Sequence, residues 1–182
     1  FSTGHGKVRE PNSIISAGAL TAIAIQSNQN DQHGGQSIVN FDSGLAPYVA
    51  KTYIKRYFSN VTKAIVLFSD VDESNESEIL ADVEKKIKLL REELIEDGFV
   101  VALTDSKEYR EEEAKRLLAL DMNIEEAVIA KVQRFARKQA LKETNRETYQ
   151  AMEAFIHNLN TMHSRAGAQV PFSSINYGMD TT

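Results

Sequence analysis

Residues 157–178 read His157-Asn-Leu-Asn-Thr-Met-His-Ser-Arg-Ala-Gly-Ala-Gln-Val-Pro-Phe-Ser-Ser-Ile-Asn-Tyr-Gly178. The stretch predicts a helix that runs into a turn, because Pro171 cannot continue a helix. From Phe172 to Tyr177 the side chains alternate as in a strand, and Gly178 ends it. We expect this corner to gather hydrogen-bonding and phosphate-pairing groups where glycine allows close backbone approach. These groups are Arg165, Gln169, Ser173, Ser174 and Asn176.

A second polar stretch, Gln26-Ser-Asn-Gln-Asn-Asp-Gln-His-Gly-Gly-Gln-Ser37, is rich in amide side chains and ends in a Gly-Gly turn. One interpretation is a helix C-terminus whose last carbonyls are capped at Gly34. The other is a polar lining that binds a base or ribose through amide hydrogen bonds, with backbone N–H groups near Gly35 facing a phosphate. The residues alone leave both interpretations open.

The composition of the 182 residues is that of a soluble globular domain, with 42% hydrophobic and 26% charged residues. No apolar run reaches the roughly 18–20 residues that span a bilayer, and no signal peptide is recognisable at the start. We therefore expect a cytoplasmic location without membrane contact. The net charge of −5 and the lack of a basic stripe argue against nucleic-acid binding.

Charge is unevenly distributed along the chain, because residues 70–126 hold 19 of the 26 acidic residues. The chain contains no cysteine, which excludes disulfides, thiolate-bound zinc and cysteine nucleophiles from these residues. The acidic segment 70–76 lacks the spacing of a calcium loop. His33, His157 and His163 fit no metal motif, so we predict no metal site.

Apolar periodicity and capping residues predict a mainly α-helical fold with a C-terminal strand. A helix over 13–31 competes with a strand over 22–26, and residues 64–68 are ambiguous between helix and strand. Pro47 suits the first turn of a helix that ends near Phe58, after a turn at 42–45. Further helices are predicted over 76–96, 105–119 and 123–163, the last capped by Asn123.

Basic residues cluster along one part of the last predicted helix. They are Lys131, Arg134, Arg137 and Lys138. The simplest interpretation is a solvated face, and a triphosphate-binding face is the alternative.

Three motifs resemble those of the anaerobic (class III) ribonucleoside-triphosphate reductases, a glycyl radical enzyme family. They are the stretch 158–178, the segment Asp31-Gln-His-Gly-Gly-Gln36 and the segment Leu45-Ala-Pro-Tyr-Val-Ala-Lys-Thr-Tyr53. The resemblance covers about residues 11–58 and 144–182. It implies a segment of the ten-stranded α/β barrel of such an enzyme, and residues 61–122 resemble nothing recognisable.

The resemblance implies reduction of ribonucleotides to deoxyribonucleotides by thiyl and glycyl radical chemistry, with formate as reductant. It also implies a structural zinc, an iron–sulfur S-adenosylmethionine activase, nucleoside triphosphate substrates, dNTP and ATP effectors, and a homodimer. Since the radical and zinc ligands are cysteines, we expect the 182 residues to be an internal, inactive segment of the catalytic subunit.

We expect 1–182 to be part of one domain. Its predicted segments are 1–60 with buried helices, the acidic region 61–122, the long helix 123–163, and the loop and strand 164–182. We expect the segment to contribute the effector site and dimer interface. The predicted effector-binding residues are Gln32, His33, Gly35, Gln36, Arg165, Gly167 and Gln169. Ser174 and Asn176 are expected nearer the barrel interior.

Two alternatives remain. The first is a non-catalytic helical dimerisation module that binds no ligand. The second is another glycyl radical enzyme, of the formate-lyase kind.

Overall fold

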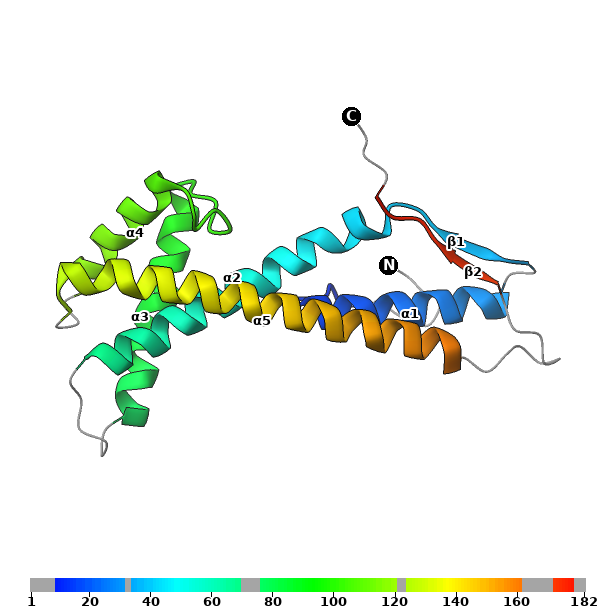
Figure 1. Ribbon diagram of the computed structural model, residues 1–182, viewed down its shortest axis with the longest axis horizontal. Coiled ribbons are helices and arrows are strands. Elements are labelled where there is room, and N and C mark those ends of the chain that lie inside the picture. Colours follow the sequence, from blue (N-terminus) through cyan, green and yellow to red (C-terminus); the bar gives the residue numbers. More distant parts are fainter. Residues whose placement is uncertain (1–8, 32–33, 70–75, 121–123, 162–171, 179–182) are drawn as a thin grey trace. The chain divides into compact units, whose positions relative to one another are not determined.

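The computed structural model describes residues 9–31, 34–69, 76–120, 124–161 and 172–178. Within these residues it contains five helices and two short strands (Figure 1). Their order is α1 (Ile14–Asp31), β1 (Gln36–Ile38), α2 (Phe41–Phe68), α3 (Glu76–Glu96), α4 (Lys107–Ala119), α5 (Glu126–Thr161) and β2 (Ser173–Ile175). The mainly helical fold with a C-terminal strand is thus confirmed, and β1 was not predicted.

The residues form two compact units. Unit 1 comprises residues 1–52 and 145–182, and unit 2 comprises residues 53–144. Helices α2 and α5 each contribute residues to both units.

The predicted helix over 13–31 is confirmed as α1, and the competing strand over 22–26 is wrong. Ser13 caps the helix, because its Oγ accepts a hydrogen bond from the Ser16 N–H at 3.3 Å. The Ile14 N–H donates to Thr52 Oγ1 at 2.9 Å, and that hydroxyl donates in turn to the Tyr48 carbonyl at 2.8 Å. A buried threonine therefore joins the start of α1 to α2.

Helix α2 is longer than predicted at both ends. It begins at Phe41 instead of Pro47, where the predicted turn at 42–45 is wrong, and it ends at Phe68 instead of Phe58. The Gly44 N–H already donates to the Asn40 carbonyl at 2.9 Å. Pro47 removes only the bond to the carbonyl of Ser43, a residue exposed to water. Continued burial of Val61 and Ile65 carries the helix past Phe58.

The other predicted helices are confirmed with small shifts. Helix α3 ends at Glu96, followed by Gly98 with a φ of 85°. Helix α4 begins at Lys107 instead of residue 105, and Ser106 caps it, because Ser106 Oγ accepts the Tyr109 N–H at 3.1 Å. Asn123 and His163, the predicted ends of the last helix, lie outside the described residues.

The core of unit 1 is built from α1, the first turns of α2 and the last turns of α5. Ile14, Ala17, Leu45 and Ala151 form one buried cluster. Ala22, Ile25 and Phe155 form another, against which Ile38 and Ile175 of the two strands pack. The apolar side chains of both strands therefore face the helices.

Small residues let α1 approach α5 closely. A Cβ built on Gly18 would lie 3.4 Å from the Ala151 carbonyl oxygen and 3.7 Å from the Ala151 Cβ. A methyl group fits this contact, and a longer side chain does not.

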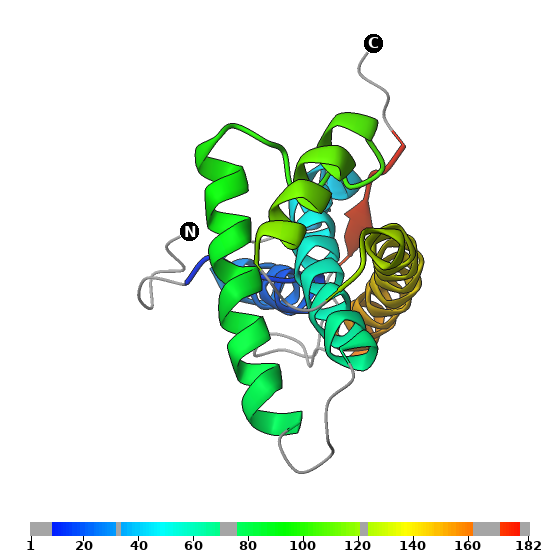
Figure 2. The ribbon, with the colours of Figure 1, turned by 90° about the vertical axis from the view of Figure 1, so that its left-hand side faces the viewer.

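The core of unit 2 joins parts of α2 and α5 with α3 and α4, and Figure 2 looks onto these helices. Its largest fully buried side chains include Tyr57, Ile65, Leu90, Leu94 and Tyr109. Four apolar positions of α3 face this core at helical spacing, and the charged residues between them are exposed or partly exposed. The four are Val83, Ile87, Leu90 and Leu94.

None of the helices in the described part of the chain has the length and apolar character needed to cross a membrane.

We expect Gly18→Leu to lower the free energy of unfolding by about 1–3 kcal/mol, because overpacking forces side chains and backbone to shift. Urea unfolding followed by circular dichroism measures this. Ala19→Leu is the matched control, since Ala19 is the exposed neighbour on the same helix. Its free energy of unfolding should change by less than about 0.5 kcal/mol. Equal losses in the two variants would contradict the close contact of α1 with α5.

Candidate functional site

The two polar stretches of the sequence meet as a parallel pair of strands. Gln36 lies opposite Ser173, Ser37 opposite Ser174 and Ile38 opposite Ile175. The Gln36 N–H donates to the Phe172 carbonyl at 2.9 Å, and the Asn176 N–H donates to the Ile38 carbonyl at 2.9 Å. Segments that lie far apart in the sequence thus share one site in unit 1.

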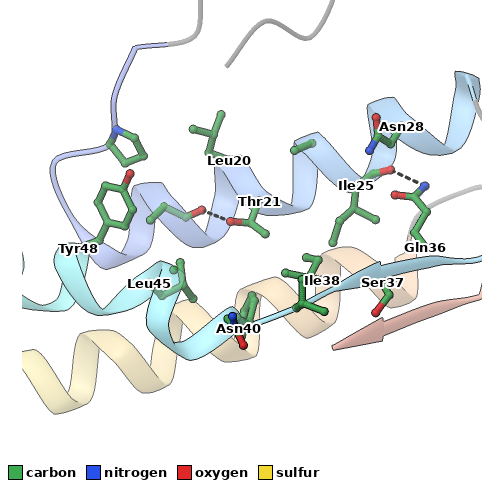
Figure 3. A pocket seen from close by; sticks show the side chains of 16 residues that line it. Leu20, Thr21, Ile25, Asn28, Gln36, Ser37, Ile38, Asn40, Leu45 and Tyr48 are labelled. Carbon is green, nitrogen blue, oxygen red and sulfur yellow. Dashed lines mark hydrogen bonds between the residues drawn. The ribbon is translucent and has the colours of Figure 1, made fainter. Parts of the chain in front are cut away.

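Amide side chains tie the strand pair to α1. Gln29 is buried and donates from Nε2 to Ser173 Oγ at 3.3 Å. Gln36 donates from Nε2 to the Ile25 carbonyl at 3.2 Å, a bond drawn in Figure 3. Both amides satisfy polar groups that packing removes from water. The amide-rich composition of this stretch is therefore partly structural.

A carboxylate fixes the far end of β2 to the start of α2. Asp42 accepts the Gly178 N–H at Oδ2 and the Ser43 N–H at Oδ1, each at 2.9 Å. These two hydrogen bonds, with that from Gly178 the stronger influence, hold the pKa of Asp42 below its usual range. Gly178 has a φ of 69°, which favours glycine at this position.

A cavity of about 350 Å³ lies between α1, β1 and the first turns of α2 (Figure 3). Apolar side chains form most of its wall, and the larger ones include Leu20, Ile25, Ile38, Phe41, Leu45 and Tyr48. Small-molecule sites have this size and this mainly apolar lining.

Polar groups at the mouth of the cavity are available to a ligand. Thr21 and Gln36 already donate to backbone carbonyls. Asn28, Ser37 and Asn40 also line the cavity, and their side chains make no hydrogen bond within the described part of the chain. Ser37 alternates along β1 with Gln36 and Ile38, whose side chains face α1, so its hydroxyl lies on the other side of the strand (Figure 3). An apolar wall beside the two amides of Asn28 and Asn40 suits a ligand that has both a flat apolar body and hydrogen-bonding edges.

Four of the predicted site residues are described by the structure. Gly35 and Gln36 lie at the beginning of β1, and Gln36 lines the cavity. Ser174 is exposed on β2, opposite Ser37. Asn176 follows β2 and binds both β1 and α2 through its backbone, the latter because its carbonyl accepts the Phe41 N–H at 3.0 Å.

The other five predicted residues lie outside the described residues and stay a prediction. They are Gln32, His33, Arg165, Gly167 and Gln169. The sequence pattern did not single out Asn28, Ser37 and Asn40 as a set. The β-branched pair Ile38-Val39 after the Gly-Gly turn is the signal that could have indicated β1 and its cavity.

A buried carboxyl group in unit 2 is the other candidate for chemistry. Glu113 accepts hydrogen bonds from Tyr57 (2.7 Å) and Gln133 (2.8 Å) at Oε2, and from Tyr109 (3.2 Å) at Oε1. Burial raises the pKa of Glu113, and the three hydrogen bonds oppose that rise. Since Glu113 is fully buried and its two carboxyl oxygens accept hydrogen bonds from three buried side chains, we assign it a structural role.

No cluster of three or more His, Asp or Glu side chains that could bind a metal occurs within the described ranges. His157 is exposed on α5.

With this geometry the chain is a mainly helical segment in which two strands that are distant in the sequence pair next to a cavity. A family model described as anaerobic ribonucleoside-triphosphate reductase matches residues 1–182, and the chain belongs to this family. The family is one of anaerobic ribonucleotide reduction. A search of curated proteins found no match.

We expect Glu113→Gln to flatten the pH dependence of stability. In the folded protein the pKa of Glu113 is raised from 4.5, so wild-type stability is highest below that value and falls as pH rises toward the folded pKa. Glutamine keeps the size and one acceptor oxygen, which can still bind the Tyr57 and Gln133 donors, its NH2 group can donate to the Tyr109 hydroxyl oxygen, and it carries no titratable proton. Urea unfolding at a series of pH values measures the difference, and identical pH profiles would contradict it.

Glu113→Leu, which leaves three buried donors unpaired, should lower the free energy of unfolding by roughly 2–5 kcal/mol at every pH.

We expect Gly35→Ala to destabilise unit 1 by about 1 kcal/mol, because the new Cβ would lie 3.3 Å from the Phe172 carbonyl that accepts the strand hydrogen bond. Gly44→Ala is the control of opposite sign. It lies in α2 with nothing within 4 Å of a new Cβ, so alanine should stabilise by about 0.5–1 kcal/mol. Chemical unfolding measures the change in the free energy of unfolding for both variants. A Gly35→Ala variant that is more stable than the wild type would refute the tight contact.

Proposed function

We propose that this chain acts within a catalytic subunit that reduces ribonucleoside triphosphates to deoxyribonucleotides, and that the unit 1 cavity binds a nucleotide effector. The observation that carries the proposal is the apolar cavity lined also by Asn28 and Asn40, whose side-chain amides make no hydrogen bond within the described residues. A base fits the apolar wall, and side-chain amides can pair with its hydrogen-bonding edge. Membership of the family of anaerobic ribonucleoside-triphosphate reductases is the reason to propose a nucleotide as the ligand.

The parallel strand pair supports a phosphate position at the beginning of both strands. Gln32 and His33 precede β1 in the sequence, and Arg165, Gly167 and Gln169 precede β2. Because β1 and β2 run parallel, both polar segments lead into the same end of the pair. An arginine near glycine backbone N–H groups matches the chemistry of phosphate recognition. These five residues are therefore proposed to contact the effector phosphates, and Ser174 and Asn176 to lie nearer the barrel interior.

The radical chemistry implied by the family resemblance requires groups that these residues do not fit. Thiyl radicals and a cysteine-bound zinc need cysteine, and the chain has none. We assign no radical step to these 182 residues. The glycyl radical, the zinc, formate and the activase are proposed to act with other parts of the parent enzyme.

A second candidate function is dimerisation, favoured by exposed apolar side chains on α5. Tyr149 and Ile156 lie seven residues apart in unit 1 and are 66% and 55% exposed. Side chains at this spacing share one face of a helix and suit a helix from a second copy. A homodimer in light scattering whose melting temperature no nucleotide shifts would favour a module without a ligand.

We expect Asn28→Ala to weaken effector binding by up to about tenfold, the usual effect of losing one amide hydrogen bond. Equilibrium dialysis of the intact protein with each dNTP and with ATP measures the dissociation constants. Gln26→Ala is the matched control, because Gln26 is an exposed amide on the same helix that does not line this cavity. Unchanged affinity in Asn28→Ala, or an equal loss in Gln26→Ala, would count against the effector site.

A further inference from the structure

Unit 2 contains a second cavity, of about 560 Å³, that the proposed effector site does not use. Its lining comes from α2, from the loop before α4 and from one face of α5. The lining residues are Tyr53, Ala102, Thr104, Asp105, Arg134, Arg137, Lys138 and Leu141. On α5 the four residues follow an i, i+3, i+4, i+7 spacing, so they share one face of the helix.

The cavity is positively charged. Arg134, Arg137 and Lys138 supply three cationic side chains, and Asp105 is the acidic residue among the lining residues. None of the three cations forms an ion pair or hydrogen bond within the described ranges. By contrast, Arg116 of α4 contacts Glu93, Asp97 and Glu112. Unit 2 is rich in acids, yet within the described residues none of these three cations forms an ion pair of that kind.

Arg137 is held at the inner side of the cavity. It is half-buried, and its Nε is enclosed without a hydrogen-bond partner among the described residues. Burial raises the pKa of Tyr53 and of Glu113, and the positive charge of Arg137 opposes both rises. An enclosed donor without an acceptor is costly, so it favours an anionic ligand that supplies one.

Side-chain contacts hold the wall opposite α5 in place. The Tyr53 and Thr104 hydroxyls hydrogen-bond to each other, which ties α2 to the loop that carries Asp105. The Tyr53 ring stacks on Tyr57, with ring centroids 6.2 Å apart, and Tyr57 is fixed in turn by Glu113. A site whose walls are already ordered loses little entropy when a ligand enters.

We propose that this second cavity binds the phosphate chain of a polyphosphate, either inorganic or carried by a nucleotide. Guanidinium groups pair with phosphate oxygens in a bidentate manner, and a lysine ammonium adds a point charge. Three cations against one carboxylate suit an anion of several charges better than a single carboxylate. The site lies in unit 2 and does not depend on the effector site of unit 1.

Two measurements on the intact protein test the site. Isothermal titration calorimetry with inorganic tripolyphosphate and with ATP gives affinities for the wild type, for the double variant Arg134→Ala/Lys138→Ala and for Lys131→Ala. Lys131 is an exposed cation on the same helix that does not line the cavity. We expect the double variant to bind tripolyphosphate at least about tenfold more weakly and Lys131→Ala to match the wild type.

Amine acetylation of the unaltered protein provides a readout that does not depend on the folding of a variant. Tripolyphosphate should slow acetylation of Lys138 several-fold and leave Lys131 and Lys142 unchanged. Absence of saturable tripolyphosphate binding, an equal loss in Lys131→Ala, or uniform protection of all three lysines would overturn the proposal. Equal affinities for ATP and tripolyphosphate would show that the site contacts the phosphate chain alone, and tighter ATP binding would show that it also contacts the nucleoside. Asn28→Ala should leave this binding intact, which separates the two sites.

Discussion

Unit 1 depends on the parallel pairing of β1 with β2. The pair joins residues 36–38 to residues 173–175, and such a long loop costs chain entropy that grows only slowly with its length. Two short strands alone are marginally stable in water. Ile38 and Ile175 therefore matter, because they pack on the cluster of Ile25 and Phe155. Gln29 and Asp42 add hydrogen bonds at the two ends of β2. The cavity exists because this pairing holds β1 opposite α1.

Unit 2 is organised around a polar group instead. Glu113 is surrounded by Tyr57, Tyr109 and Gln133, so that one carboxyl group links α2, α4 and α5. A buried network of this kind is stabilising only when every member is satisfied, and it then favours one arrangement of the helices. The same network supports Tyr53 through its ring contact with Tyr57. Glu113 thus helps to position Tyr53 in the wall of the second cavity, although Glu113 itself is not among the residues that line it.

Sequence pattern predicted the helices well where apolar periodicity and caps agree, as in α1 and α3. It placed the start of α2 too late, because Pro47 is a strong signal for a first turn and the Asn40–Gly44 hydrogen bond depends on the fold. β1 has three residues, two of them polar, and is stabilised by a strand that only tertiary structure brings near. The burial of Glu113 could not be predicted either, since on α4 it follows two other glutamates and has the local pattern of an exposed residue.

The predicted site residues Gly35, Gln36, Ser174 and Asn176 do lie on or beside one strand pair. No local sequence pattern indicates that the amides of Asn28 and Asn40 line a cavity without a hydrogen-bond partner among the described residues.

The strand pair also has two outer edges. In a parallel ladder the backbone groups of alternate residues point away from the partner strand, and here these belong to Ser37 on β1 and Ser173 and Ile175 on β2. Such edges are templates for any extended backbone, including that of another molecule. Four of the six paired residues are serine or glutamine, so the strand pair offers another strand little apolar surface. Unit 1 therefore has the means to extend its ladder by backbone hydrogen bonding while its side chains discourage indiscriminate aggregation.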